Sequence, residues 1–287
     1  MLQLKVNKKL QLPDGLTSLD LEMEFRPGKV TGISGDSGVG KTSVLRMLAG
    51  LSEPDNGTIS NDGNVWFNKT ERQNLIPQKR GLGFVFQDHQ LFPNMSVIGN
   101  LRYAANGDKN AVDKTTYYLD RFGLSDFKNS MPNSLSTGQK KRVAIIGALI
   151  TNPKLLLLDE PFAALDEKIV KIIQDEILNY TKESLCITVL VTHEIAEIFK
   201  MVDYLYTIKS GKIYSRGTPS GLFTSGASGN TLSIAGIVVG NGGDNDHVKV
   251  LVNDQLLEVP RTSETFEIGE KILVNLGAGK IEIMRQK

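Results

Sequence analysis

The chain has 287 residues, of which 40% are hydrophobic, and its formal net charge is +1 at neutral pH. That length suggests about two domains, and so small a net charge argues against a nucleic-acid binder that relies on a basic surface. The single cysteine excludes a disulfide framework. The sequence contains no apolar run as long as a membrane span and no apolar N-terminal core typical of a signal peptide.

The first chemical signature along the chain is a glycine-rich loop between a strand-like run at 29–34 and an apolar helix. Residues 35–42 read Gly-Asp-Ser-Gly-Val-Gly-Lys-Thr, and such glycines let backbone N–H groups gather around phosphate oxygens at a helix N-terminus. Lys41 supplies a cation for the β- and γ-phosphates, and the Thr42 hydroxyl suits Mg²⁺. The alternative is a glycine-rich turn that only happens to precede a helix. Such a turn would not need the complete pattern of residues 35–42. The predicted nucleotide contacts here are Gly35, Ser37, Gly38, Gly40, Lys41, Thr42 and Ser43.

The second signature is the segment Ser136-Thr137-Gly138-Gln139, which opens a helix running through residues 143–149. The N–H groups and dipole of this helix N-terminus can meet a phosphate. Residues 140–142 read Lys-Lys-Arg and are the main basic cluster of the chain. We interpret this cluster as a solvated helix face.

The third signature is an acidic pair, Asp159 and Glu160, directly after the all-leucine run 155–158. A run that is apolar throughout is typical of a strand buried on both faces of a parallel sheet, and such sheets bind ligands at the carboxyl ends of their strands. Asp159 can hold Mg²⁺, and Glu160 can polarise a water for in-line attack on a γ-phosphate. A solvated Asp-Glu loop is the alternative interpretation.

In this order, the three segments resemble the ATP-binding subunit of an ABC (ATP-binding cassette) transporter. The resemblance implies an α/β P-loop NTPase fold, ATP and Mg²⁺ as cofactors, and ATP hydrolysis coupled to transport. It also implies that Gln87 senses the γ-phosphate and Mg²⁺, and that His193 contacts the γ-phosphate. The implied catalytic residues are Glu160, His193 and Gln87, and the implied Mg²⁺ ligands are Thr42, Gln87 and Asp159.

The family pattern further implies a head-to-tail homodimer. Ser136, Gly138 and Gln139 would face ATP that the Lys41 loop of another subunit holds, and Asp166 lies in the segment similar to the family's D-loop. Two departures from the pattern stand out. Thr137 replaces the first signature glycine, and no aromatic residue precedes Phe25 to stack on adenine, so GTP is a possible substrate.

The resemblance divides the chain into an ABC ATPase domain at 1–217, a small-residue linker at 218–230 and a small β-barrel of the TOBE or oligomer-binding type at 231–287. Within the first domain we expect an N-terminal antiparallel β region and a helical subdomain at about 88–140. Four apolar runs predict strands in the tail, at 248–252, 256–259, 271–276 and 281–283, with a turn at Asn253-Asp254. The tail is either an anion sensor, with Asn241, Gly242 and Gly243 as clustered candidates, or a structural appendage.

The segments 83–88, 91–93 and 99–103 look most similar to ATPases of molybdate and tungstate importers. This likeness implies a subunit at the cytoplasmic face of the cell membrane, with integral membrane permease subunits and an extracytoplasmic substrate-binding protein as partners and no nucleic acid. Import of another anion or small solute is the alternative cargo. A soluble ABC ATPase acting on ribosomes would normally join two cassettes in one chain. A P-loop kinase or GTPase would not need the segment 136–139.

Overall fold

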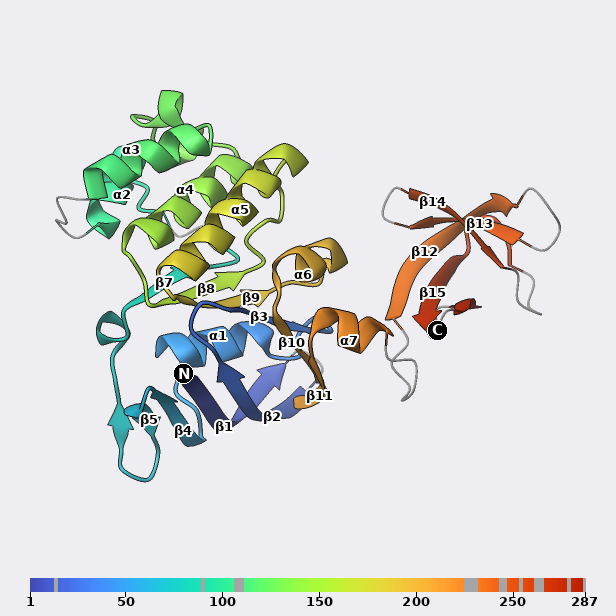
Figure 1. Ribbon diagram of the computed structural model, residues 1–287, viewed down its shortest axis with the longest axis horizontal. Coiled ribbons are helices and arrows are strands. Elements are labelled where there is room, and N and C mark those ends of the chain that lie inside the picture. Colours follow the sequence, from blue (N-terminus) through green and yellow to red (C-terminus); the bar gives the residue numbers. More distant parts are fainter. Residues whose placement is uncertain are drawn as a thin grey trace. The chain divides into compact units, whose positions relative to one another are not determined.

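The computed structural model describes residues 1–12, 15–88, 91–105, 111–224, 232–242, 247–252, 255–260, 266–277 and 280–285. They belong to two compact units, Met1–Arg216 and Gly217–Lys287 (Figure 1). The division falls next to residue 217, where the sequence analysis ended the ATPase domain.

An 11-stranded mixed sheet organises the first unit, in the order β6-β5-β4-β1-β2-β11-β10-β3-β9-β8-β7. Its strands are β1 (Leu2–Leu12), β2 (Gly15–Phe25), β3 (Val30–Gly35), β4 (Asn56–Asn61), β5 (Asn64–Asn68), β6 (Gln73–Asn74), β7 (Leu82–Val85), β8 (Leu155–Asp159), β9 (Ile187–Val191), β10 (Tyr204–Lys209) and β11 (Lys212–Gly217). Strands β1, β2, β4, β5 and β6 pair antiparallel, which confirms the antiparallel β region. Strands β10, β3, β9, β8 and β7 pair parallel.

Helices cover both faces of the parallel strands, with α1 on one side and α4 and α5 on the other (Figure 1). The helices here are α1 (Lys41–Ala49), α4 (Thr137–Ile150), α5 (Glu167–Glu183) and α6 (Ile195–Met201). Every residue of β8 and β9 is buried, as the all-leucine run predicted. The carboxyl ends of β3, β8 and β9 therefore meet at one edge of a fully covered sheet.

Arg80 fixes the far end of α1, the helix that follows the glycine-rich loop. Its guanidinium is 3% exposed and donates to the carbonyl oxygens of Met47 and Leu48, at 2.9 and 2.7 Å. Those carbonyls belong to the last turn of the helix, where a cation is favourable, and the Met47 carbonyl also accepts from the N–H of the C-cap residue Gly50 at 3.1 Å. Arg80 follows the short helix η1 (Pro77–Lys79).

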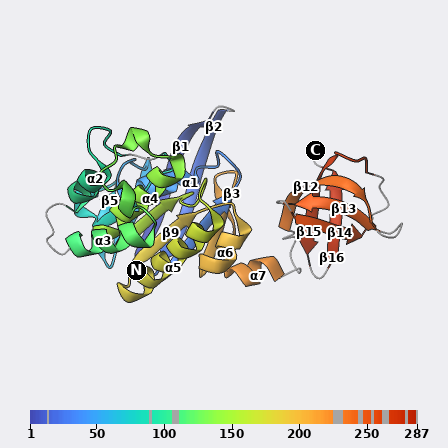
Figure 2. The ribbon, with the colours of Figure 1, turned by 90° about the horizontal axis from the view of Figure 1, so that it is seen from above.

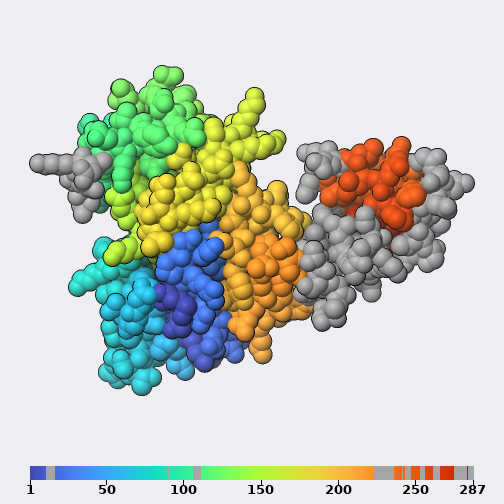
Figure 3. Space-filling model, in the orientation of Figure 1, coloured from blue at the N-terminus to red at the C-terminus, as the bar shows by residue number. Residues whose placement is uncertain are grey.

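The predicted helical subdomain contains α2 (Val97–Ala104), α3 (Ala111–Arg121) and the short helices η2 (Ser125–Phe127) and η3 (Pro132–Ser134), and it leads into α4. Tyr117 and Arg121 of α3 both donate to one oxygen of Glu176 on α5, each at 2.9 Å. In the space-filling view the green helical region accordingly borders the yellow surface of α5 (Figure 3). No helix in the described ranges is both long and apolar enough to cross a bilayer.

The second unit is a curved five-stranded antiparallel sheet in the order β14-β13-β12-β15-β16 (Figure 2). Its elements are α7 (Pro219–Thr224), β12 (Leu232–Asn241), β13 (His247–Val252), β14 (Gln255–Pro260), β15 (Lys271–Gly277) and β16 (Lys280–Arg285). The edge strands β14 and β16 contact each other around a wholly aliphatic core. The four predicted strands are confirmed, and β12 is an additional one.

Helix α7 lies within the segment that the sequence analysis assigned to the linker. The rest of that linker, at 225–230, lies outside the described residues, as do Gly243 and the predicted turn at Asn253-Asp254.

Candidate functional site

The glycine-rich loop joins β3 directly to α1, as predicted, and two glycines are required by its shape. Gly35 has φ 147°, and a Cβ there would lie 2.2 Å from the carbonyl oxygen of Ile208. Gly40 has φ 101°, and its Cβ would lie 2.8 Å from Leu19. A side chain at Gly35 would displace the backbone of β10, and one at Gly40 would be strained by its positive φ and would push the side chains of Leu19 and Leu10 aside. The loop between them, with Ser37 and Gly38, is exposed at the edge of the sheet.

Lys41 lies back over this loop. Its ammonium donates to the carbonyl oxygens of Gly35 and Asp36, both at 2.8 Å. Burial lowers the pKa of Lys41, and the nearby carboxylates of Glu160, Asp159 and Asp36 oppose that shift. The ammonium therefore lies against the backbone of the loop, where an anion would be attracted both by it and by the loop N–H groups.

A hydrogen bond connects the loop to the acidic strand end. Thr42 donates to Asp159 Oδ2 at 2.8 Å, across 117 residues of sequence. Asp159 is 2% exposed, and burial raises its pKa while the Thr42 bond lowers it. Two of the three predicted Mg²⁺ ligands, Thr42 and Asp159, are thus adjacent.

This donor set fits Mg²⁺. A buried carboxylate beside a hydroxyl supplies hard oxygen ligands, and Mg²⁺ in nucleotide sites takes only one or two protein ligands besides phosphates and water. No cluster of three or more His, Cys, Asp or Glu side chains suited to a metal occurs among the described residues. Thr42 and Asp159 would hold the ion, and Gln87, exposed two residues after β7, extends from a neighbouring strand end.

Glu160 and His193 lie together at the same edge. Asp159 and Val191 are register partners at the ends of β8 and β9, and the Glu160 N–H donates to the Val191 carbonyl at 3.0 Å. His193 Nδ1 is 3.4 Å from Glu160 Oε1, and His193 Nε2 is 3.3 Å from Glu194 Oε1. Two carboxylates thus flank the imidazole, and the His193 side chain is 63% exposed.

A cavity of about 510 Å³ opens beside this pair. It is lined by Glu160, His193, Glu194 and the loop 162–165, which carries the segment similar to the D-loop. Asp166 is exposed at the N-cap of α5 and makes no capping hydrogen bond. The structure therefore shows Asp166 as a solvent-exposed N-cap residue.

The signature segment forms a separate feature. Ser136 and Gln139 form a capping box at the start of α4, with the Ser136 side chain accepting from the Gln139 N–H at 3.2 Å. A Cβ on Gly138 would lie 2.9 Å from the Ala164 carbonyl oxygen, so Gly138 packs against the loop after Glu160. Thr137 is exposed at the first helical position. Within the described residues, no hydrogen bond joins Ser136 to the loop of Lys41.

The interpretation of residues 140–142 as a solvated face is wrong for Lys141. Its side chain is 1% exposed, and its ammonium donates to the Gln87 carbonyl at 3.1 Å. Arg142 is also partly buried and donates to the Phe122 carbonyl at 2.6 Å. Helical spacing gives a signal that the sequence analysis missed, because Lys141 is four residues before the buried Ile145 and so lies on the apolar face.

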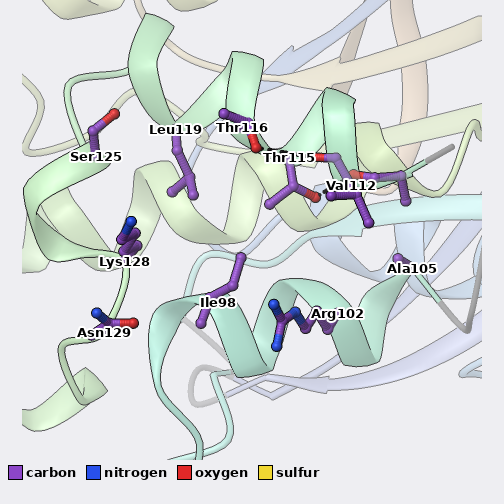
Figure 4. Close-up of a pocket in the computed structure, with 11 residues that line it drawn as sticks. Ile98, Arg102, Ala105, Val112, Thr115, Thr116, Leu119, Ser125, Lys128 and Asn129 are labelled. Carbon is purple, nitrogen blue, oxygen red and sulfur yellow. Dashed lines mark hydrogen bonds between the residues drawn. The ribbon is translucent and has the colours of Figure 1, made fainter. Parts of the chain in front are cut away.

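The helical region carries a groove of its own, with a cavity of about 810 Å³. Figure 4 shows Ile98 and Arg102 of α2 facing Val112, Thr115 and Leu119 of α3 across it. Val112 is 62% exposed there. The groove lies entirely within the first unit.

Known proteins of similar sequence and structure show the same family resemblance as the motifs of this chain. A family model described as ABC transporter matches residues 19–163. A molybdenum import ATP-binding protein of Paramagnetospirillum magneticum is 39% identical over 212 residues, covering 72% of this chain and 58% of that protein. The corresponding protein of Aliivibrio fischeri is 30% identical, covering 99% of this chain and 79% of its own length. A dimeric bacterial ABC transporter cassette aligns with a TM-score of 0.67 at 26% identity, covering 76% of this chain and 99% of that structure.

Relatives named for other cargoes are nearly as similar. ATP-binding proteins for import of sulfate/thiosulfate (Mycobacterium bovis), iron(III) (Haemophilus influenzae) and spermidine/putrescine (Marinobacter nauticus) are 35%, 38% and 36% identical. The matched region spans only 58% and 60% of the length of two molybdenum-import relatives. Since the family model spans half of the chain and the Aliivibrio relative aligns with nearly all of it, the chain belongs to the ABC transporter ATP-binding family.

Proposed function

We propose that this chain is the ATP-hydrolysing subunit of an ABC importer. The hydrogen bond from Thr42 to Asp159 carries the proposal, because it brings a phosphate-binding loop against an acidic strand end. Glu160 and His193 lie beside that strand end. This arrangement supplies anion binding, metal ligands and a base at one sheet edge, which are the parts that phosphoryl transfer to water needs.

In this proposal each residue has a separate role. Lys41 exchanges the carbonyls of Gly35 and Asp36 for phosphate oxygens, and the loop N–H groups bind the same phosphates. Glu160 accepts the proton of the attacking water, and His193 contacts the γ-phosphate. Thr42 and Asp159 would hold Mg²⁺, which when bound neutralises charge on the phosphates.

The active form in this proposal is a head-to-tail homodimer. Ser136 caps its own helix and leaves the N-terminus of α4 exposed, which suits a phosphate delivered by a second subunit. The related cassette of known structure is dimeric. Each ATP would then lie between the Lys41 loop of one subunit and residues 136–139 of the other.

The partners in this proposal are integral membrane permease subunits and, through them, an extracytoplasmic substrate-binding protein. The groove between α2 and α3 suits the permease contact, because it combines the apolar Ile98, Val112 and Leu119 with the cations Arg102 and Lys128. This role places the chain at the cytoplasmic face of the membrane.

The cargo in this proposal is molybdate. Support comes from the names of the two molybdenum-import relatives and from a small β unit that we take as TOBE-like. Sulfate, iron(III) and polyamines are the second candidates, because relatives named for them are of similar identity.

The proposed activity is tested by Mg²⁺-dependent release of phosphate from ATP, with GTP in parallel. Lys41→Ala should abolish ATP and ADP binding in calorimetry, because it removes the cation above the loop. Arg46→Ala, on the exposed side of the same helix, should bind like the wild type. Unchanged ATP affinity in Lys41→Ala would overturn the phosphate-loop assignment. Co-purification with an apolar membrane protein separates an importer from a non-transport ABC ATPase.

A further inference from the structure

Lys141 occupies a position where α4 is otherwise apolar. Its side chain is 1% exposed and shares a helix face with the buried Ile145, Ala148 and Leu149, on a helix that contacts β7. An ammonium removed from water in such a place costs free energy unless polar atoms replace the lost hydration. The identity of those polar atoms therefore indicates what Lys141 does.

The compensating atoms lie at the start of the loop that carries Gln87. Lys141 Nζ donates to the carbonyl oxygens of Phe86 and Gln87, at 3.4 and 3.1 Å. These are the first two residues beyond β7, which ends at Val85. Within the described ranges Lys141 has no ion-pair partner at 4.0 Å or less. Backbone carbonyls, and no carboxylate, thus hold the ammonium.

The ammonium of Lys141 also interacts electrostatically with the acidic residues of the nucleotide site. Burial lowers the pKa of Lys141, and Asp159, Glu160 and Asp88 act in the opposite direction. In the described part of the chain the Gln87 side chain is exposed and makes no hydrogen bond, whereas its carbonyl is held by Lys141. The backbone of the sensor residue is thus fixed while its amide is available to a ligand.

We propose that Lys141 is a positioning residue, whose buried ammonium clamps the backbone of Phe86 and Gln87 to α4 and thereby sets the place of the Gln87 amide in the nucleotide site. The proposal rests on the proposed ATPase function. Because α4 begins at the signature segment, a displacement of that helix carries Phe86 and Gln87 with it. The clamp thus connects the surface that would meet a second subunit with the residue that would meet the γ-phosphate.

The test compares Lys141→Met, which keeps the length and removes every donor, with Lys141→Arg, which keeps a cation. Lys141→Met should lower kcat by roughly 10- to 100-fold, as expected for a misplaced active-site group, with KM for ATP changed by less than about threefold. Lys141→Arg should recover part of the loss. Lys140→Met is the matched control, since Lys140 is on the same helix and only half-buried.

A double-mutant cycle with Gln87→Ala decides whether Lys141 acts through Gln87. If it does, Gln87→Ala/Lys141→Met should match Gln87→Ala alone within about twofold in kcat, because a clamp on a missing amide has no further effect. Multiplicative losses, or a Lys141→Met variant that behaves like Lys140→Met, would overturn the proposal. Lys141→Leu, which also has no donor, replaces Lys141→Met in the cycle if the methionine variant does not fold.

Hydrogen exchange of the full-length, nucleotide-free protein gives a readout that does not depend on hydrolysis. In Lys141→Met, amide hydrogen exchange should be faster than in the wild type at residues 86–88, and the exchange rate of β8 should be unchanged. Equal loss of protection in both segments would make Lys141 a core residue only and would overturn the clamp. A wild-type protein without ATPase activity would refute the proposed function, and the exchange result would still judge the clamp.

Discussion

Glu160 combines a strained backbone with an exposed edge of the sheet. Its φ is 45°, a conformation that non-glycine residues rarely adopt and that costs on the order of 1–3 kcal/mol. The bond from its N–H to the Val191 carbonyl holds that conformation. Ala164, in the loop that contacts Gly138, has φ 62°. Two unfavourable backbone conformations thus occur within five residues of one another. The surrounding structure must stabilise each of them, and such strained residues are typical of active-site segments.

Glu160→Gln keeps the shape of the side chain and removes its basicity. We expect ATP binding to persist and turnover to fall by roughly 10² to 10⁴, the range for loss of general-base assistance. The variant should also accumulate as an ATP-bound dimer on gel filtration. Phosphate release and calorimetry measure the two effects.

Glu167→Gln is the matched control for this variant. Glu167 is also a glutamate near the D-loop segment, but its side chain is 84% exposed and pairs with Lys171 on the surface of α5. It should hydrolyse ATP like the wild type. Wild-type turnover in Glu160→Gln would refute the assignment of the base.

At the scale of elements, the two sides of helix α3 have different surroundings. One side is fixed to α5, where Tyr117 and Arg121 both donate to the buried Glu176. The other side, with Val112, faces the groove toward α2 (Figure 4). A helix that is anchored on one side and exposes apolar groups in a groove on the other is suited to receive a partner segment.

Val112→Asp places a charge in the α2–α3 groove without touching the nucleotide site. We expect unchanged ATP binding and basal hydrolysis, and loss of co-purification with the permease, because a carboxylate would be desolvated in the contact. Pull-down from membranes expressing both proteins measures this. Leu185→Asp is the control, since Leu185 is 67% exposed and lies outside the groove. Equal permease binding by both variants would exclude the groove as the docking site.

At the scale of the whole molecule, the residues proposed to bind phosphate and the signature segment form separate surfaces. The loop of Lys41 reaches Asp159 through Thr42, whereas among the described residues the hydrogen bonds of Ser136 stay within the first turn of α4. In the proposed head-to-tail arrangement a complete site therefore requires two chains. The related dimeric cassette is consistent with that requirement.

Cysteines introduced at Ser37 and Thr137 test the head-to-tail arrangement. Both positions are exposed. In the Glu160→Gln background, the Ser37→Cys/Thr137→Cys chain should form a disulfide-linked dimer with ATP and not without it. The native Cys186 does not compete, because it is buried and burial raises its pKa to about 11. Each single variant is the control, and a double variant that fails to crosslink with ATP would contradict the arrangement.

A separate prediction concerns anion binding by the second unit. If it senses molybdate, that ligand should raise the melting temperature of the full-length protein, since a ligand at 100 times its Kd stabilises the folded state by about 2.7 kcal/mol. A chain ending at residue 230 should show no shift and should still bind ATP. Sulfate is the control anion. No shift with millimolar molybdate would make the unit a structural appendage.

The sequence by itself determined the local chemistry. The glycine-rich loop, the buried β8 strand with its acidic end and the capped start of α4 all follow from short-range patterns, because glycine conformation, strand burial and helix capping depend on nearby residues. Only the tertiary structure decided which segments meet. It placed Thr42 against Asp159 and turned Lys141 inward onto the Gln87 carbonyl, contacts that span 117 and 54 residues. The local sequence marks Lys141 as basic, but only the packing of α4 on β7 buries it.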